Sequence, residues 1–273
     1  SKVARIEHNP QTGRVRLLNK HGKLLKERLL KACENGWLTQ DRFAEKYYSI
    51  SPYAFCSGNP IRFIDRNGDS VVVSGSQQAA AFQQMQDFLG KELSMSMSAN
   101  GTIIASQKEG VKLSRAGRKA MKAFGSATIT VNIVAENTKE TSSGNLYVGG
   151  AFMGNTVNAD GTVTARQEVN PEVLGAMSNA YGKPGQDMMH EVTEAYQGAL
   201  ISQRSGVSSP ISNQPGSVYP DAHNIAIPQS GIVKEHYYNS AGKEVQTLSP
   251  AVVRSTYTVY PRRQQPVVIM RFP

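Results

Sequence analysis

From residue 70 onward the chain alternates short runs rich in β-branched residues with longer amphipathic runs, and this alternation limits its fold more than any other feature. Apolar residues at every second position indicate strands, whereas apolar residues three and four apart indicate helices. The pattern therefore predicts an α+β domain over 70–273. We expect strands over 70–74, 102–105, 127–135, 144–156, 162–168, 233–238 and 243–247, the last two forming a hairpin. The three strands between 127 and 168 predict an antiparallel meander.

Helices are expected where longer amphipathic runs meet capping and breaking signals. Four of them fall at 77–93, 114–124, 171–181 and 187–204. Pro171 suits the first turn of a helix, and Asp187 suits an N-cap position after the Gly-Lys-Pro-Gly break. Leucines at helical spacing predict another short helix over 23–33. The chain thus divides into a basic leader (1–35), a turn-rich segment (36–69) and an effector-sized domain (70–273).

Composition narrows the classes of function. The formal net charge is +9, of which residues 1–66 carry +7 and residues 67–273 only +2. Nucleic-acid binding usually requires clustered lysines and arginines, so a nucleic-acid partner is not expected for the domain. Cys33 and Cys56 are the only cysteines, too few for a disulfide framework or a thiolate zinc site. No run of about 18 apolar residues occurs, so we expect no membrane span.

The segment 36–69 reads GWLTQDRFAEKYYSISPYAFCSGNPIRFIDRNGD and is dense in aromatic residues and turn signals. Its spacing matches a known pattern at Asp41, Ala44, Tyr47 or Tyr48, Ser51, Pro52, Tyr53, Asn59, Pro60, Asp65 and Gly68. With these residues the segment resembles the end of the core shell of Rhs and YD-repeat proteins.

The resemblance implies that a variable C-terminal toxin follows this segment. Such a polymorphic toxin is loaded into a contractile (type VI) secretion apparatus, together with a chaperone or another component of that apparatus. It is delivered by contact into a target cell, and a cognate immunity protein neutralises it. The resemblance therefore predicts a secreted antibacterial effector in 70–273.

Residues 188–196 read MMHEVTEAY and contain H-E-x-x-E, a pattern similar to the H-E-x-x-H of zincin-type metallopeptidases. Positions four apart share one face of a helix, so His190 and Glu194 can hold one metal ion. Glu191 lies next to that pair and can take a proton from an attacking water. The flanking residues are apolar, as expected for a buried helix. The motif predicts a zinc centre with Glu191 as general base.

A third ligand has to come from elsewhere in the chain, because an H-E-x-x-E helix supplies only two. A second histidine would offset the negative charge that Glu194 brings in place of imidazole. The first candidate is His223, in the stretch YPDAHN at 219–224. Asp221 is an alternative if this stretch is extended, because residues two apart in a strand point the same way. His236, inside an expected strand, is the third candidate.

Tyr219 lies close to His223 in the sequence and is a candidate donor to an oxyanion. If the helix is exposed to solvent, the motif has an alternative interpretation: His190 and Glu194 would form an ordinary i,i+4 surface pair that binds no metal. Two of the five histidines, His8 and His21, lie in the leader, and the other three lie in the last third beside the motif. This clustering favours a metal site.

These observations together predict a zincin-like α+β effector that hydrolyses a protein or peptide substrate. Zinc would be held by His190, Glu194 and His223, with Glu191 as general base. A nuclease toxin is the first alternative, and it predicts a basic cleft. A binding module in which H-E-x-x-E is accidental is the second.

Overall fold

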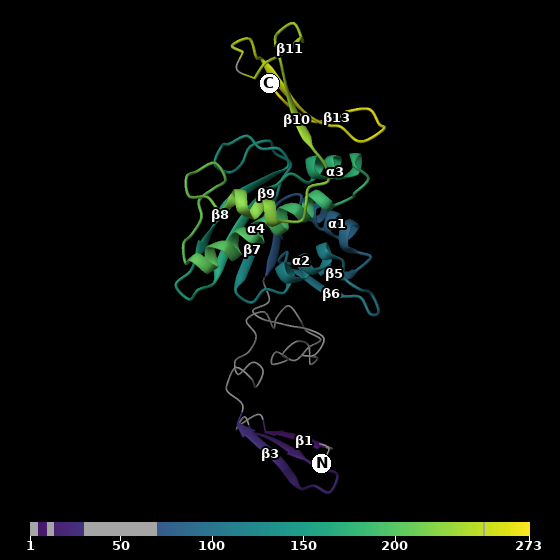
Figure 1. Ribbon diagram of the computed structural model, residues 1–273, viewed down its shortest axis with the longest axis vertical. Coiled ribbons are helices and arrows are strands. Elements are labelled where there is room, and N and C mark those ends of the chain that lie inside the picture. Colours follow the sequence, from purple (N-terminus) through teal and green to yellow (C-terminus); the bar gives the residue numbers. More distant parts are fainter. Residues whose placement is uncertain (1–4, 10–13, 30–69, 248) are drawn as a thin grey trace. The chain divides into compact units, whose positions relative to one another are not determined.

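The computed structural model describes residues 5–9, 14–29, 70–247 and 249–273 (Figure 1). The chain forms two compact units, Ser1–Asp65 and Arg66–Pro273. The segment 36–69, which resembles the Rhs core, lies outside the described residues, as do Cys33 and Cys56. The resemblance therefore stays a prediction.

The N-terminal unit contains a three-stranded antiparallel sheet of β1 (Arg5–Asn9), β2 (Arg14–Leu18) and β3 (Leu24–Leu29). The helix expected over 23–33 is thus wrong in its described part. The Asn19 side chain accepts hydrogen bonds from the backbone of His21 and Lys23 and closes a turn between β2 and β3. Pairing with β2 then satisfies the backbone of β3, and this overrides the helical spacing of the leucines.

The second unit is built on a four-stranded sheet in the order β4-β7-β9-β8. These strands are β4 (Val71–Ser74), β7 (Ile129–Ala135), β9 (Val163–Val169) and β8 (Gly150–Val157). Strand β7 is parallel to β4 and β9, and β8 is antiparallel to β9. The antiparallel meander is therefore wrong, because β9 lies between β7 and β8. Strand β9 suits this central place because six of its seven residues are at least half-buried.

The four expected helices are present; three are shorter than the sequence indicates, and the fourth extends one residue further at each end. They are α1 (Gln78–Leu89), α2 (Arg115–Phe124), α3 (Pro171–Ala180) and α4 (Gln186–Ser205). Ser114 caps α2 by accepting the backbone N–H of Gly117, and Asn170 caps α3 in the same way, with Pro171 in the first turn.

Asp187 does not cap α4, contrary to the sequence prediction. The helix starts after Gly185, whose φ of 74° is left-handed and favours glycine. The Asp187 carboxylate, in the first turn, instead accepts hydrogen bonds from the Ser178 hydroxyl and from the backbone and hydroxyl of Ser230. This buried carboxylate fixes the start of α4 against α3 and the chain near residue 230.

Helix α4 is the centre of the second unit. It packs on β7, β8 and β9 and contacts the other four helices, and Figure 1 shows it lying across the sheet. Every residue from 187 to 196 is consequently buried. The H-E-x-x-E motif therefore does not lie on a solvated helix face, and the simple surface pair is excluded.

The remaining elements flank this body. Strands β5 (Leu93–Met97) and β6 (Ile103–Gln107) form a hairpin. An antiparallel sheet has the order β11-β10-β12-β13, and its strands are β10 (Val233–Tyr238), β11 (Glu244–Val245), β12 (Arg254–Val259) and β13 (Val267–Phe272). The hairpin predicted over 233–247 is confirmed.

Within the described residues, no helix is both long and apolar enough to cross a membrane. The α+β class is confirmed, with mixed and antiparallel sheets.

Candidate metal centre

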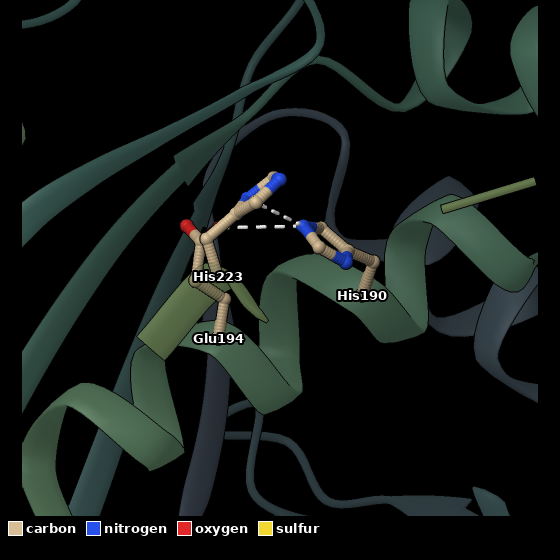
Figure 2. A group of neighbouring side chains, drawn as sticks. All are labelled: His190, Glu194 and His223. Carbon is tan, nitrogen blue, oxygen red and sulfur yellow. Dashed lines mark hydrogen bonds and ion pairs between the residues drawn. The ribbon is translucent and has the colours of Figure 1, made fainter. Parts of the chain in front are cut away.

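Helix α4 carries two of the three side chains that meet at one point. His190 and Glu194 are one turn apart, and the His190 Nε2 atom lies 3.3 Å from the Glu194 Oε2 atom. Both side chains are 2% exposed. Figure 2 shows them gathered with His223 on one side of the helix. The helical spacing that predicted this pair is confirmed.

The third side chain, His223, comes from a short helix, α5 (Tyr219–Ile225), that packs on α4. Its Nδ1 atom lies 2.7 Å from Glu194 Oε2 and 3.1 Å from His190 Nε2. Because the segment is helical and not extended, Asp221 does not share the direction of His223, and its side chain is exposed. Among the described residues, His190, Glu194 and His223 are the group that could hold a metal ion.

The spacing of these three atoms fits a tetrahedral cation. Zinc ligands at about 2.0–2.1 Å from the ion lie about 3.3 Å from one another in a tetrahedron. The observed separations are 2.7, 3.1 and 3.3 Å. A small outward movement of His223 from Glu194 would complete the geometry. Two imidazole nitrogens and one carboxylate oxygen form a donor set that suits zinc.

Hydrogen bonds behind the ligands orient them. The His190 Nδ1 atom lies 2.5 Å from the carbonyl oxygen of Ile227, so Nδ1–H donates there and the Nε2 lone pair faces the centre. The backbone N–H of Ile227 in turn donates to the hydroxyl of Thr193 at 2.9 Å. The chain that follows α5 therefore fixes the ring orientation of a ligand on α4.

Gln167 on β9 is a site residue that sequence reasoning missed. Its side chain is fully buried, and its single Nε2 atom donates to Glu191 Oε2 at 2.5 Å and to Glu194 Oε1 at 3.0 Å. Its Oε1 atom is buried without a hydrogen-bond partner. No motif marks this residue, because its role depends on the packing of α4 over β9. One amide thus holds both carboxylates of the motif in place.

The three buried ionisable groups His190, Glu191 and Glu194 shift one another's pKa values. Burial opposes protonation of His190, but its hydrogen bond to Glu194 and the charges of Glu191 and Glu194 raise its pKa to about 9. Burial also acts against ionisation of Glu194, yet the hydrogen bonds from His190 and His223 lower its pKa. Burial, and then the Glu194 charge, raises the pKa of Glu191. Protons and a divalent cation therefore compete for the same atoms.

Glu191 contacts both the wall of a cleft and the Gln167 amide that also binds Glu194. Its carboxylate is held against the backbone of Gly150, where a Cβ atom would come within 2.0 Å of it. Gly150 also lines a cleft of about 270 Å³ between β8 and the chain around Ile211. Tyr219 lines the same cleft, and its ring centroid is 5.3 Å from that of His223. The cleft thus opens beside the motif.

Tyr219 keeps its proton at this position, because burial, and then the charges of Glu194 and Glu191, raise the pKa of its hydroxyl to about 12.

His236, the other ligand candidate, lies apart on β10. Its ring nitrogens face Glu244 Oε1 at 2.7 Å and the Tyr260 hydroxyl at 2.6 Å. His236 is therefore not brought to the cluster, and His223 is the third member.

No family model, curated protein or solved structure matches this chain. The chemistry of the centre therefore has to be inferred from its own side chains. Those side chains are two histidines and one glutamate in ligand geometry, a further buried carboxylate, and an adjoining cleft. Together they can hold a divalent cation and accept a proton beside it.

Proposed function

We propose that residues 66–273 form a zinc-dependent peptidase and that His190, Glu194 and His223 hold the metal ion. The observation that carries this proposal is the convergence of these three side chains in the interior, with their ligand atoms 2.7–3.3 Å apart. Burying ionisable groups is costly unless they are paired or bind a metal. A helix with such a cluster at the centre of the fold is best explained by a bound cation.

The side chains divide the chemistry among them. His190, Glu194 and His223 would hold the zinc ion, which would supply Lewis acidity for the attacking water and for the amide carbonyl. In this proposal Glu191 accepts the proton of the attacking water and passes it to the leaving amine. Gln167 fixes the Glu191 carboxylate. The Tyr219 hydroxyl, at the cleft wall beside His223, can donate a hydrogen bond to the oxyanion that forms.

A nuclease is supported less well than a peptidase. Phosphodiester substrates need cationic groups near the reacting bond. The described residues that line the cleft include no lysine or arginine, and Glu191 and Glu194 add negative charge beside it. An amide substrate, which is neutral, suits these surroundings.

The test is to measure zinc content and hydrolysis in matched variants of the purified full chain. Wild type is expected to bind about one zinc per chain, and His190→Ala and His223→Ala to lose it. Glu191→Gln should keep zinc but lose hydrolysis of a casein or proteome-derived peptide substrate by a factor of about 100 or more. His236→Ala serves as the control histidine and should change neither. A wild-type chain that takes up no added zinc would overturn the proposal.

We further propose that this peptidase is the toxin of an Rhs-type antibacterial effector. The support is the motif spacing of 36–69, which directly precedes the residues 70–273 that carry the metal cluster. Such an effector acts after contact-dependent delivery into a target cell and is neutralised by an immunity protein. Expression in a bacterial host should slow growth, and the Glu191→Gln variant should not. Equal growth inhibition by both forms would contradict a peptidase toxin.

A further inference from the structure

The cleft beside the motif has a chemical character of its own. Among the described residues that line it, none is charged. Its walls carry apolar side chains such as Leu146, Phe152 and Ile211 together with hydroxyl and amide groups of residues such as Ser212 and Asn213. Hydroxyl and amide groups can bind a peptide backbone without favouring either sign of charge.

The charges nearest to the cleft are negative. The Glu191 carboxylate touches Gly150 in the cleft wall, and Tyr219 in the same wall feels the charges of Glu194 and Glu191. An acidic side chain placed here would be repelled by these carboxylates. A basic side chain would have to leave water for walls that carry no charge, and the nearby carboxylates of Glu191 and Glu194 already pair with Gln167 and His223.

The volume of the cleft limits what can enter. Pockets for drug-sized ligands usually measure about 300–1,000 Å³. At about 270 Å³ this cleft is slightly smaller. It therefore suits one or two side chains of a polypeptide that continues outside it. Leu146 lines the cleft and is 59% exposed, so it offers apolar surface to a side chain that enters.

We infer that this cleft is a specificity site that selects a large, uncharged side chain, apolar or aromatic, next to the amide bond to be cleaved. This inference rests on the proposed peptidase activity for its role, but the binding preference follows from the cleft alone. The substrate is thus a polypeptide segment with such a side chain and no charged residue at that position.

The first experiment maps cleavage sites in a proteome-derived peptide mixture by mass spectrometry, using the zinc-loaded full chain. One position beside the cleaved bond should favour Phe, Tyr, Leu and Met over Asp, Glu, Lys and Arg by about tenfold or more. In Leu146→Glu the preference for apolar side chains should fall and cleavage beside Lys and Arg should rise. Ile232→Glu is the matched control, because Ile232 is 71% exposed and does not line the cleft, and its pattern should equal that of wild type.

The second experiment measures binding without catalysis. Titration of the metal-free chain with the amides of N-acetyl-phenylalanine, N-acetyl-lysine and N-acetyl-glutamate should shift the NMR signals of Gly150 and Ala151 with the first probe only. Leu146→Glu should weaken that shift, and Ile232→Glu should not.

The outcomes separate this inference from the proposed function. Cleavage that favours charged residues would overturn the inference and leave the peptidase standing. Binding of the phenylalanine probe without any peptide cleavage would keep the inference as a binding preference and remove the peptidase. If no probe shifts the cleft signals and cleavage shows no preference, the inference fails.

Discussion

Gln167 is the residue whose surroundings explain most about the centre. Glu191 and Glu194 are buried carboxylates on one helix, and like charges in such surroundings repel each other strongly. The Nε2 atom of Gln167 donates to both and holds each in a fixed direction. Glu194 as a metal ligand and Glu191 as a general base need different orientations. The Gln167 amide, as a hydrogen-bond donor to both carboxylates, fixes each orientation.

Replacing Gln167 with leucine should therefore weaken the centre without removing a ligand. Loss of such an outer hydrogen bond typically lowers metal affinity by about 10–100-fold. The metal-free chain should also lose about 1–3 kcal/mol of unfolding free energy, because buried acceptors lose their donor. Zinc affinity measured by competition with a chelator checks the first value, and chemical denaturation the second.

Gln84→Leu is the matched control for this variant. Gln84 on α1 also donates a hydrogen bond, which is partly buried, to the Pro171 carbonyl at 2.6 Å, but it does not contact the cluster. Its replacement should reduce stability and leave zinc affinity unchanged. Equal losses of affinity in both variants would mean that Gln167 acts only through general stability.

The stability of the metal-free chain should depend on pH through His190. The pKa of its ring rises from 6.5 to about 9 on folding, so the folded chain binds this proton more tightly than the unfolded chain. The resulting stabilisation is full below pH 6.5 and is lost as the pH rises towards 9. The melting temperature of metal-free protein should fall across this window.

His190→Gln offers the comparison for that titration. It replaces the titrating ring with a side-chain amide of similar reach, and its melting temperature should fall less between pH 6.5 and 9 than that of wild type. Zinc-loaded wild type should also show a smaller dependence, because the cation replaces the proton. A wild-type melting temperature that rises across this window would contradict the prediction.

At the scale of elements, the centre depends on how α5 is held against α4. The Lys119 ammonium group on α2 donates to the carbonyl oxygens of Ile225 and Ala226 at the end of α5. These carbonyls are the unpaired acceptors that a helix leaves at its C-terminus. A cation from a neighbouring helix thus fixes the element that carries His223.

Lys119→Met should lower zinc affinity by about tenfold, since the apolar stem is kept but the anchor that positions the ligand is lost. The effect should appear as faster zinc release, measured by transfer to a chromogenic chelator. Lys122→Met, at an exposed position on the same helix, is the control and should release zinc at the wild-type rate. Identical rates in the two variants would show that α5 is held by other contacts.

The elements also show what the sequence could predict. The motif helix, its two ligands and three further helices follow from local periodicity and capping, and the structure has them. Contacts between segments far apart in the chain determine three other features: the role of Gln167, the helical form of 219–225 and the central place of β9. Local spacing carries no information on such contacts. The sequence ranked His223 ahead of His236 as a ligand, but only the folded chain shows that His223 reaches the cluster and that His236 does not.

At the scale of the whole molecule, the metal cluster belongs to one compact unit. Its three ligand candidates and their hydrogen-bond partners Gln167, Thr193 and Ile227 all lie in Arg66–Pro273. A chain restricted to 66–273 should fold, melt cooperatively and bind zinc with the affinity of the full chain. Calorimetric titration of both chains checks this, and a clearly weaker affinity in the shorter chain would show that residues 1–65 contribute to the centre.

The distance along the chain between the ligands has a topological consequence. Glu194 and His223 are 29 residues apart, so an ion held by both ties a loop in the polymer. A covalent cross-link that closes a loop of this size removes enough entropy from the unfolded chain to stabilise the fold by about 3–4 kcal/mol. An ion would tie the same loop reversibly. Removing the metal ion would therefore open this loop and lower the free energy of unfolding by up to this amount, and adding the ion back would restore it.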